Sequence, residues 1–509
     1  MRTLSELDAS FLFLESSRAP LHVGGTYVFK KKSARARFGF DKFKTLIESK
    51  LGNEVFFRQK LIEAPLNNEF PIWCDDPKFN LTNHVHHIQL NTLSSPCTLD
   101  ELASKILNTP LERNQPLWQA YYIDGLENED NFDKTHFALI LVTHISALDS
   151  ATGEDVLSQL LDVTPQVSKL KTPVPWVATE IPESGSILEA AYNKALTIPS
   201  ALTNLLKDTA SSAFYGVLYE QLQRLNLPAA LLSVATTPIN RRVTSARVSD
   251  NLHISFTTVR ELRQGIENVT TNDILIGICA EALHNYLNDI GGLPKAPLIA
   301  LSPISVRSTS LHYKSGKQLT ASLFSLITNE SHPIKRIRKI HAMATSSNHY
   351  DDAISANRLT ELVPSNMAAL SARVYSEFLL AQKFKPMFNL PIVNIPGPQF
   401  PLYFEENELV SLACSSPLFD GIGLTITIIS YNGNYNINCT YCPDLFDGNK
   451  AFSEYLKDAT TRIESLQNEE LELEPEDTNR SLVSGIIEDI TGTVSGLFSS
   501  AQDTSKQDA

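Results

Sequence analysis

The sequence predicts a mixed α/β protein built from two similar domains. Three observations indicate this: the chain has 509 residues, short apolar strands alternate with amphipathic helices, and this alternation stops after residue 165 and resumes from residue 246. One hydrophobic core seldom grows past about 250–300 residues, so a chain of this length is expected to divide. The composition, 42% hydrophobic and 20% charged, suits two ordinary globular cores.

Residues 1–165 form the expected N-terminal domain. The segments with strand or helix patterns are Thr26–Phe29, Phe137–Thr143, Phe40–Leu51 and Leu99–Leu107. The first two are short apolar runs, which indicate strands, and the last two have apolar residues at helical spacing. Thr98 or Asp100 can cap the second helix.

Residues 166–245 differ in texture and are expected to be a largely helical crossover between the domains. They begin with a proline-rich stretch and continue with a long run of small, helix-forming residues. The C-terminal domain is then expected over 246–466. Its expected elements are a helix at Thr271–Asn288 capped by Thr271 or Asn272, strands at Leu298–Ile304, Leu424–Ser430 and Tyr435–Cys442, and a last helix at Gly448–Leu466.

The tail, 467–509, has a different character. It holds ten acidic and two basic residues, and 469–477 reads as a solvated acidic run. Residues 480–499 place large apolar side chains on one helical stripe, which is typical of an amphipathic helix. This stripe can contact a lipid surface or a partner, or it can dock on the body of the protein.

The charge and the cysteines exclude several classes of function. The net charge is −14, so a nucleic-acid partner is not expected. The six cysteines are scattered, and the one close pair, Cys439 and Cys442, has no second pair with which to bind zinc. We therefore expect no metal. With no apolar run of about 18 residues, a cytoplasmic protein is expected, peripheral at most at a membrane or lipid inclusion.

The strongest candidate for chemistry is the segment 142–150, Val-Thr-His-Ile-Ser-Ala-Leu-Asp-Ser, which follows a fully apolar strand. Other motifs occur along the chain in a defined order. They are 4–12 (LSELDASFL), 20–25 (PLHVGG), 73–77 (WCDDP), 84–87 (HVHH), Pro116-Leu117-Trp118, Asn272-Asp273, 303–307 (PISVR), 394–398 (NIPGP) and Ser430-Tyr431.

Together these motifs resemble, over about residues 1–466, the bacterial wax ester synthase/diacylglycerol acyltransferase family of the CoA-dependent acyltransferase superfamily. The resemblance implies an α/β fold of two chloramphenicol-acetyltransferase-like domains around a central tunnel, joined by the helical crossover. It also implies transfer of an acyl group from acyl-CoA to diacylglycerol or to a long-chain alcohol, which makes triacylglycerol or wax ester. Acyl-CoA would be a substrate or ligand, and no cofactor would be bound permanently.

The family carries H-H-x-x-x-D-G at this place, and its second histidine is the general base. An alcohol needs such a base, and histidine is suited to the role because its pKa lies near the working pH. Counting back from Asp149, the first family histidine is His144, but the second is replaced by Ile145, and Ser150 replaces the glycine. Asp149 would be a structural, ion-pairing residue, and the resemblance makes Arg307 its candidate partner.

His144 can substitute as the base only if it turns into the tunnel. Neighbouring side chains of an extended segment point to opposite faces, so His144 should point away from the tunnel if Ile145 points into it. Ser146 and Ser150 are not bases at neutral pH. Two hypotheses follow: an impaired O-acyltransferase, or a non-catalytic pseudoenzyme that binds acyl-CoA or neutral lipid.

The remaining motifs have structural interpretations beside functional ones. Pro116, Leu117 and Trp118 are expected to pack and turn the chain, and Asn272 and Asp273 to cap a helix. The histidines at 84, 86 and 87 could form a metal site or a displaced base, but structural roles are expected. Two basic runs could contact CoA phosphates or lipid, or could simply be solvated: Lys30, Lys31, Lys32, Arg35, Arg37 and Lys335, Arg336, Arg338, Lys339.

Overall fold

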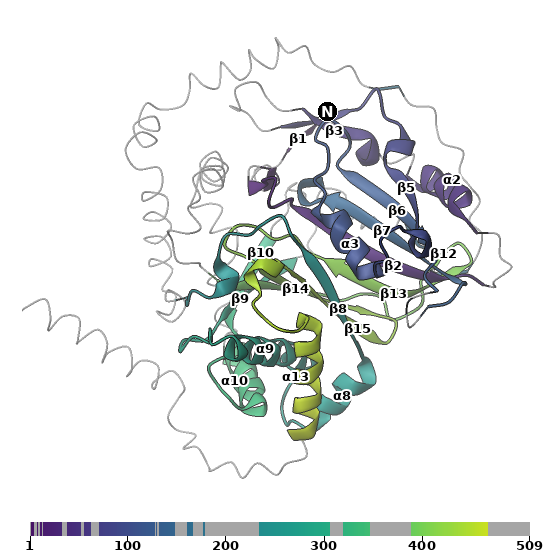
Figure 1. The fold of residues 1–509 in the computed structure, drawn as a ribbon. Helices are drawn as coiled ribbons and strands as arrows, with labels where there is room; N and C mark the ends of the chain where they lie inside the picture. The colour runs from purple at the N-terminus through teal and green to yellow at the C-terminus, as the bar shows by residue number, and fades with distance from the viewer. Residues whose placement is uncertain are drawn as a thin grey trace, which may run out of the picture.

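The structure is a computed structural model of the 509-residue chain (Figure 1). The residues it describes are 2–4, 8, 11–12, 14–32, 38–51, 55–62, 71–127, 129, 132–147, 160–165, 177–178, 234–305, 319–346 and 388–466. The predictions for Asp149, Ser150 and Arg307, for most of the crossover and for the tail lie outside these residues.

The first half of the chain forms most of a six-stranded sheet. In order across the sheet, its strands are β12 (Tyr403–Phe404), β13 (Asn407–Ser415), β2 (His22–Lys30), β7 (His136–His144), β6 (Trp118–Asp124) and β5 (Val85–Gln89). A three-stranded sheet lies beside it, in the order β1 (Arg2–Thr3), β4 (Ile72–Asp75) and β3 (Gln59–Ile62).

Two helices cover opposite faces of the first sheet, which explains why β7 is buried from Phe137 to His144 and apolar from Phe137 to Val142. Helix α2 (Phe40–Leu51) packs on the face that carries Phe29, Leu139 and Leu141. Helix α3 (Leu99–Asn108) packs on the face that carries Ile140 and Val142. Thr98 caps α3 in a capping box with Glu101, which confirms one of the two predicted caps.

The second half forms a second six-stranded sheet. Its strands, in order, are β10 (Leu319–Ser325), β9 (Ile299–Ser305), β11 (Leu390–Ile395), β14 (Leu424–Tyr431), β15 (Asn434–Tyr441) and β8 (Val248–Ser255). Figure 1 shows its helices gathered on one side of this sheet: α8 (Phe256–Gln264), α9 (Thr271–Asp289), α10 (Pro333–Ser346) and α13 (Phe452–Leu466). The predicted helices and strands of this half are thus present, with ends that shift by a few residues.

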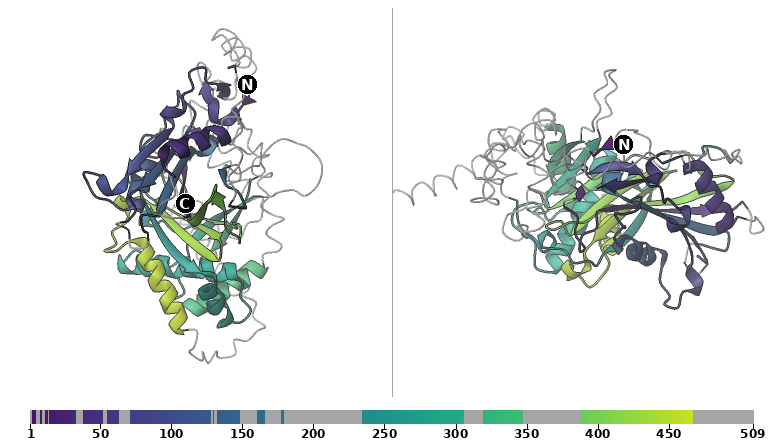
Figure 2. Two further views of the ribbon diagram at one scale, coloured as in Figure 1. Left: turned by 90° about the vertical axis from the view of Figure 1, so that its right-hand side faces the viewer. Right: turned by 90° about the horizontal axis from the view of Figure 1, so that it is seen from above.

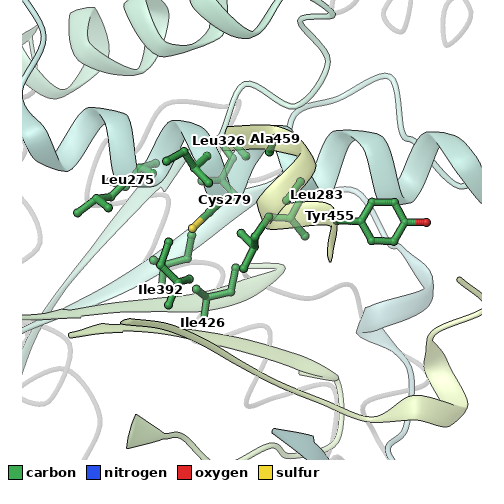
Figure 3. Close-up of a cluster of buried hydrophobic side chains, with 14 of the residues drawn as sticks. Leu275, Cys279, Leu283, Leu326, Ile392, Ile426, Tyr455 and Ala459 are labelled. Carbon is green, nitrogen blue, oxygen red and sulfur yellow. The ribbon is translucent and has the colours of Figure 1, made fainter. Parts of the chain in front are cut away.

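The core of the second half lies between these helices and the sheet. Helix α9 is the centre of this core, because it is buried from Asp273 to Leu283 without a break. In Figure 3, Leu275, Cys279 and Leu283 of α9 meet Ile392 and Ile426 of the sheet. Tyr455 and Ala459 of α13 complete the cluster.

The two halves interpenetrate, which their composition did not indicate. Strand β13 comes from the second half but pairs antiparallel with β2, so it belongs to the first sheet. Figure 2 shows the green strands of the second half between the blue strands of the first half and the teal strands of the second half. The sequence boundary between two successive domains therefore does not describe the observed sheets, because an extended segment can pair with either sheet edge.

A polar stripe on α3 joins the halves a second time. Asp100, Ser104 and Asn108 are spaced four residues apart, so they lie on one face of α3. They meet alternate residues of β8 and the residue just before it: Asp100 accepts from Asn251 (2.9 Å), Ser104 accepts from the Ser249 amide (2.8 Å), and Asn108 donates to the carbonyl of the preceding Arg247 (3.5 Å).

Candidate active site

The predicted acyl-transfer motif begins at the end of β7 and is held from both sides. The amide of His144 donates to the carbonyl of Leu117 (3.0 Å), and the amide of Ile145 donates to the carbonyl of Leu21 (2.9 Å). His144 lies opposite His22 of β2 in the sheet register. The backbone of the motif is therefore fixed by the two chain segments that flank β7.

Neighbouring side chains of the motif differ in exposure. His144 is 1% exposed, whereas Ile145 is partly exposed. This is the alternation expected for successive residues of an extended segment. The motif then continues in a short 3-10 turn, Ile145–Ala147, and Asp149 lies outside the described residues.

The two ring nitrogens of His144 face different groups. Nδ1 accepts from the backbone amide of Ser146 (3.1 Å) and lies 2.6 Å from its hydroxyl oxygen. Nδ1 is therefore the unprotonated nitrogen, and the proton of a neutral ring belongs on Nε2. Nε2 lies 3.4 Å from Oε1 of Glu15, within ion-pair distance but without a hydrogen bond, and the carboxylate charge favours a proton on that nitrogen.

The carboxylate of Glu15 is the centre of this polar cluster. It accepts from Arg113 through Nη2 (2.7 Å) and Nε (3.2 Å), and from the amide of Leu21 (3.3 Å). Burial by itself would raise the pKa of Glu15, but its interactions with His144 and Arg113 outweigh this effect and lower the pKa to about 2. Glu15 is thus a carboxylate throughout the neutral range.

His22 is a second buried imidazole beside the same carboxylate. Its Nε2 accepts from the amide of Leu111 (3.3 Å) and lies 3.8 Å from Glu15. Burial lowers the pKa of His22 to about 4, and the nearby charge of Glu15 offsets this only in part. His22 is therefore neutral at neutral pH, and its ring packs edge-on against that of His144.

Sequence reasoning did not assign roles to Glu15, His22 or Arg113. His22 belongs to a motif that carried the family resemblance, but nothing in its spacing placed it beside residue 144. Glu15 and Arg113 are 98 residues apart and meet only because the chain folds back on itself. No periodicity within a segment can reveal such a contact.

The Ser146–His144–Glu15 arrangement resembles a hydrolytic triad in its order of groups, but its geometry differs. The amide of Ser146 already occupies the lone pair of Nδ1 that would have to accept the hydroxyl proton. Both Ser146 and His144 are also nearly inaccessible, at 3% and 1% exposed. The arrangement is suited to holding the end of β7 rather than to attacking a substrate.

The Pro116-Leu117-Trp118 motif packs next to this cluster. Trp118 is fully buried, and its indole N–H donates to the carbonyl of Phe57 (2.9 Å). Leu117 is buried beside Ala147 and supplies the carbonyl that receives the His144 amide. These contacts agree with the packing role expected for the motif.

In the second half, the structure brings three motifs together. Asn394 donates to Asn272 (2.9 Å), and Ser430 accepts from the Gly397 amide (3.0 Å). A Cβ atom at Gly397 would lie 2.1 Å from the carbonyl oxygen of Ser430, so this close approach requires glycine.

Asp273 forms a capping box with Thr270 at the start of α9, and it also receives a hydrogen bond from Nδ1 of His341 (2.8 Å). The capping role predicted for Asp273 is confirmed. The predicted N-cap, Thr271 or Asn272, is wrong, because the N-cap is Thr270. The Thr270-x-x-Asp273 pattern satisfies two amides reciprocally, which favours the earlier start.

The histidines at 84, 86 and 87 do not form a site. His84 is buried against Trp118 and bonds its carbonyl (2.9 Å), while the His86 ring contacts Tyr121 at a tilt and the His87 ring stacks on Phe40. Within the described residues, no group of three or more His, Cys, Asp or Glu is placed to hold a metal ion. Cys439 is buried in β15, and its partner in the sequence, Cys442, lies just after that strand.

One of the two basic runs is also not what the sequence indicated. Arg336 is fully buried and pairs with Glu281 of α9, which Arg462 also contacts (3.0 Å). Arg336 therefore cannot contact CoA phosphates or lipid, whereas Lys335 remains exposed. Helical spacing alone could not place Arg336, because its partner lies on another helix. In the other run Lys30 and Lys32 are exposed, and Arg35 and Arg37 are outside the described residues.

The fold and the motifs define a two-domain α/β protein of the acyltransferase type, and comparison with known proteins gives the family. The profile of the wax ester synthase/diacylglycerol acyltransferase catalytic domain matches residues 4–275, and that of the C-terminal domain of the same proteins matches residues 315–464. The first match alone covers more than half of the chain. The chain belongs to the wax ester synthase/diacylglycerol acyltransferase family.

Individual relatives are distant but extend over most of the chain. The chain is 26% identical over 451 residues to the O-acyltransferase WSD of Acinetobacter baylyi, covering 87% of this chain and 92% of that protein. It is 28% identical over 442 residues to a probable diacylglycerol O-acyltransferase of Mycobacterium tuberculosis, covering 86% and 92%.

Among solved structures, the wax ester synthase/diacylglycerol acyltransferase of Marinobacter aquaeolei VT8 has the same fold. The TM-score is 0.65 at 22% identity, with 91% of this chain and 99% of that chain covered. A trichothecene 15-O-acetyltransferase from Fusarium sporotrichioides matches with a TM-score of 0.50 at 11% identity, covering 91% and 94%. The mixed α/β fold predicted from the sequence is therefore confirmed.

Of the helices formed by the described residues, none is both long and apolar enough to span a membrane.

Proposed function

We propose that this protein binds acyl-CoA together with diacylglycerol or a long-chain alcohol, and that it transfers the acyl group only slowly. The supporting observation is that Nδ1 of His144 accepts from the Ser146 amide, while Nε2, which then carries the proton, is buried 3.4 Å from the Glu15 carboxylate. The one surviving histidine of the motif therefore has no free lone pair for an alcohol proton. At the next position, where the family has its base, the chain has Ile145.

The chemistry explains why this replacement slows the reaction. The alcohol oxygen attacks the thioester carbonyl, a C–O bond forms, and the C–S bond breaks to release CoA; the alcohol proton must leave as the C–O bond forms and ends on the CoA sulfur. A positioned general base contributes about 10²–10⁴-fold to such a step. Binding both substrates in a tunnel between the domains would still contribute by orientation, so slow transfer is expected rather than none.

The test is an assay of purified protein with radiolabelled palmitoyl-CoA and either hexadecanol or diolein. The variant Ile145→His, alone and with Ser150→Gly, should raise turnover at least about 10²-fold, following the magnitude for a general base. Ile145→Asn is the matched control, because it adds a polar side chain without a base at neutral pH. Rapid wild-type turnover that His144→Ala abolishes would contradict the proposal.

A second candidate is a binding protein without turnover, which the same engagement of His144 favours. It predicts that wild-type protein and Ile145→His bind palmitoyl-CoA with equal affinity in a calorimetric titration, while no labelled ester forms with the wild type in long incubations. Measurable, protein-dependent ester formation by the wild type decides for the slow enzyme.

We also propose that residues 480–499 contact a neutral-lipid surface. The support is the apolar helical stripe in the sequence, which carries little charge of either sign. Removing residues 468–509 should abolish flotation of the protein with triacylglycerol emulsions. Unchanged flotation, together with a lower melting temperature, would instead indicate that the stripe docks on the protein body.

A further inference from the structure

A short turn near the N-terminus lies between the His144 cluster and the second half of the chain. The turn runs from Ser16 to Ala19, closed by hydrogen bonds from the Ala19 amide to the Ser16 carbonyl (2.9 Å) and from the Ser16 amide to the Ala19 carbonyl (3.3 Å). Its flanking residues and its tip have different neighbours. This difference suggests what the turn does.

The two residues that flank the turn hold the end of β7. Glu15 faces Nε2 of His144, and Leu21 receives the amide of Ile145 (2.9 Å). The two flanks are themselves joined, because the Leu21 amide donates to Oε1 of Glu15 (3.3 Å). The same carboxylate is anchored from outside the turn by Arg113. One side chain thus fixes the ring and the backbone of the motif together.

The tip of the turn is held by the second half. Arg18 pairs with Asp420 (3.0 Å), and the Arg18 carbonyl accepts from Arg247 (2.7 Å). Asp420 also accepts from the amide of Val243 (3.1 Å). Ala19 is 1% exposed and packs in a small apolar cluster with residues that all come from the second half: Val243, Leu418, Cys442 and Leu445.

We propose that Glu15 is a positioning residue: its carboxylate, 3.4 Å from Nε2 of His144, holds the orientation of that ring, and the turn that follows it couples the motif to the seating of the second half. A displacement of the second half would move Arg18 and Ala19, and the four-residue turn is too short to absorb it before Glu15 and Leu21 move. This inference rests on the proposed function in one respect, that His144 supports the motif rather than acting as its base.

The first test is nitrogen NMR of histidine-labelled full-length protein, with the His144 signals assigned by His144→Asn. In the wild type, His144 should be a single tautomer protonated on Nε2. Glu15→Ala should shift and broaden the His144 ring signals, because the ring loses its neighbour at Nε2, and Glu15→Gln, which keeps an acceptor oxygen, should restore them. A folded Glu15→Ala protein whose His144 ring signals match those of the wild type would overturn the proposal.

The second test examines the coupling between the turn and the motif, and it can be carried out even where the Glu15→Ala protein does not fold. Arg18→Met should shift and broaden the His144 ring signals, although the side chain of Arg18 is directed to Asp420 of the second half. Lys32→Met is the matched control, because Lys32 also forms an ion pair with the second half (Glu406, 3.0 Å) but lies at the far end of β2. Equal effects of the two variants, or none for Arg18→Met, would refute the coupling.

A kinetic arm separates this inference from the proposed function. In the Ile145→His background, adding Glu15→Ala should lower kcat about tenfold or more while changing KM less, because misplacing a catalytic group by about 1 Å can cost up to 10²-fold. If Ile145→His gives no activity, the proposed function fails while the NMR tests still decide the role of Glu15. If activity appears and is indifferent to Glu15→Ala, the positioning role fails alone.

Discussion

Each half of the chain holds a histidine against a carboxylate, and the two pairs differ in how much of the imidazole remains free. In the first half, His144 is 1% exposed and has a neighbour at each ring nitrogen, Ser146 and Glu15. In the second, His341 bonds Asp273 through Nδ1 at 2.8 Å, and its side chain is 23% exposed. The first imidazole is enclosed, whereas the second is attached at one side.

The difference teaches that a histidine beside a carboxylate is not by itself a general base. A base needs a free lone pair aimed at the substrate, so the assignment depends on which nitrogen is already engaged. In His144 the lone pair of Nδ1 accepts a hydrogen bond from the backbone amide of Ser146. In His341, Nδ1 donates to Asp273, so the lone pair is on Nε2. Of the two imidazoles, His144, the histidine of the family motif, is thus the one whose lone pair is already engaged.

Acid gives the largest expected effect, and it should act on the first pair. The pKa of Glu15 is lowered from 4.5 to about 2. The stabilisation of the folded protein by this carboxylate is therefore complete above pH 4.5 and is lost as the pH falls through 2. The pKa of His22 is lowered from 6.5 to about 4, so the unfolded chain binds a proton first and stability falls between these values. Each shift corresponds to about 3 kcal/mol.

Hydrogen exchange between pH 7 and pH 4, corrected for intrinsic rates, measures this effect. The amide of Ile145, which bonds Leu21, should lose protection as the pH falls. The amide of Ile274, which bonds the Thr270 carbonyl beside the second pair, is the internal control. Equal loss of protection at both amides would mean that the first cluster has no special sensitivity to acid.

Removing the two imidazoles should have unequal effects on stability. His144→Ala leaves a buried cavity and takes a partner from the Glu15 carboxylate, which should lower the free energy of unfolding by about 2–3 kcal/mol. His341→Ala removes a partly exposed side chain from a carboxylate that keeps its bonds to Thr270, and should cost less than about 1 kcal/mol. Urea denaturation measures both, and equal costs would contradict the contrast between an enclosed and an open pair.

The sequence predicted local elements well, and contacts between distant segments poorly. Helix α3 was expected at Leu99–Leu107 and observed at Leu99–Asn108, because its apolar spacing and its cap are both local signals. The pairing of β13 with β2 was not expected. Residues 407–415 have the pattern of a strand, but that pattern does not indicate which strand they pair with. Glu15 and Arg336 were missed or misjudged for the same reason: their partners are far away in the chain.

The carboxylate of the second pair has a separate structural task, which a smaller prediction tests. Asp273 accepts from the Thr270 amide (2.8 Å) and hydroxyl (2.7 Å), so it caps α9 in addition to holding His341. Asp273→Ala should cost about 1–2 kcal/mol, the usual range for a lost cap. Asp273→Asn should recover most of this, because an amide oxygen can still accept from Thr270. Failure of Asn to recover stability would show that the negative charge, rather than the cap, matters.

The smallest expected effect concerns a third carboxylate, Asp100, at the contact between the halves. Burial raises the pKa of Asp100 to about 6, although the hydrogen bond from Asn251 lowers it in part. A raised carboxyl pKa destabilises the folded state above pH 6 and is relieved as the pH falls toward 4, opposite in sign to the effect of His22. In the wild type the effects of Asp100 and His22 therefore offset each other between pH 6.5 and 4.

Asp100→Asn keeps the acceptor for Asn251 and removes the titration, so it should raise the free energy of unfolding at pH 8 by about 1 kcal/mol, since the side chain is only partly buried. The same variant should lose stability more steeply than the wild type from pH 6.5 to pH 4, because the protonation of Asp100 no longer offsets the effect of His22. Urea midpoints across this range measure both effects, and parallel curves for variant and wild type would show that Asp100 is ionised normally in the folded protein.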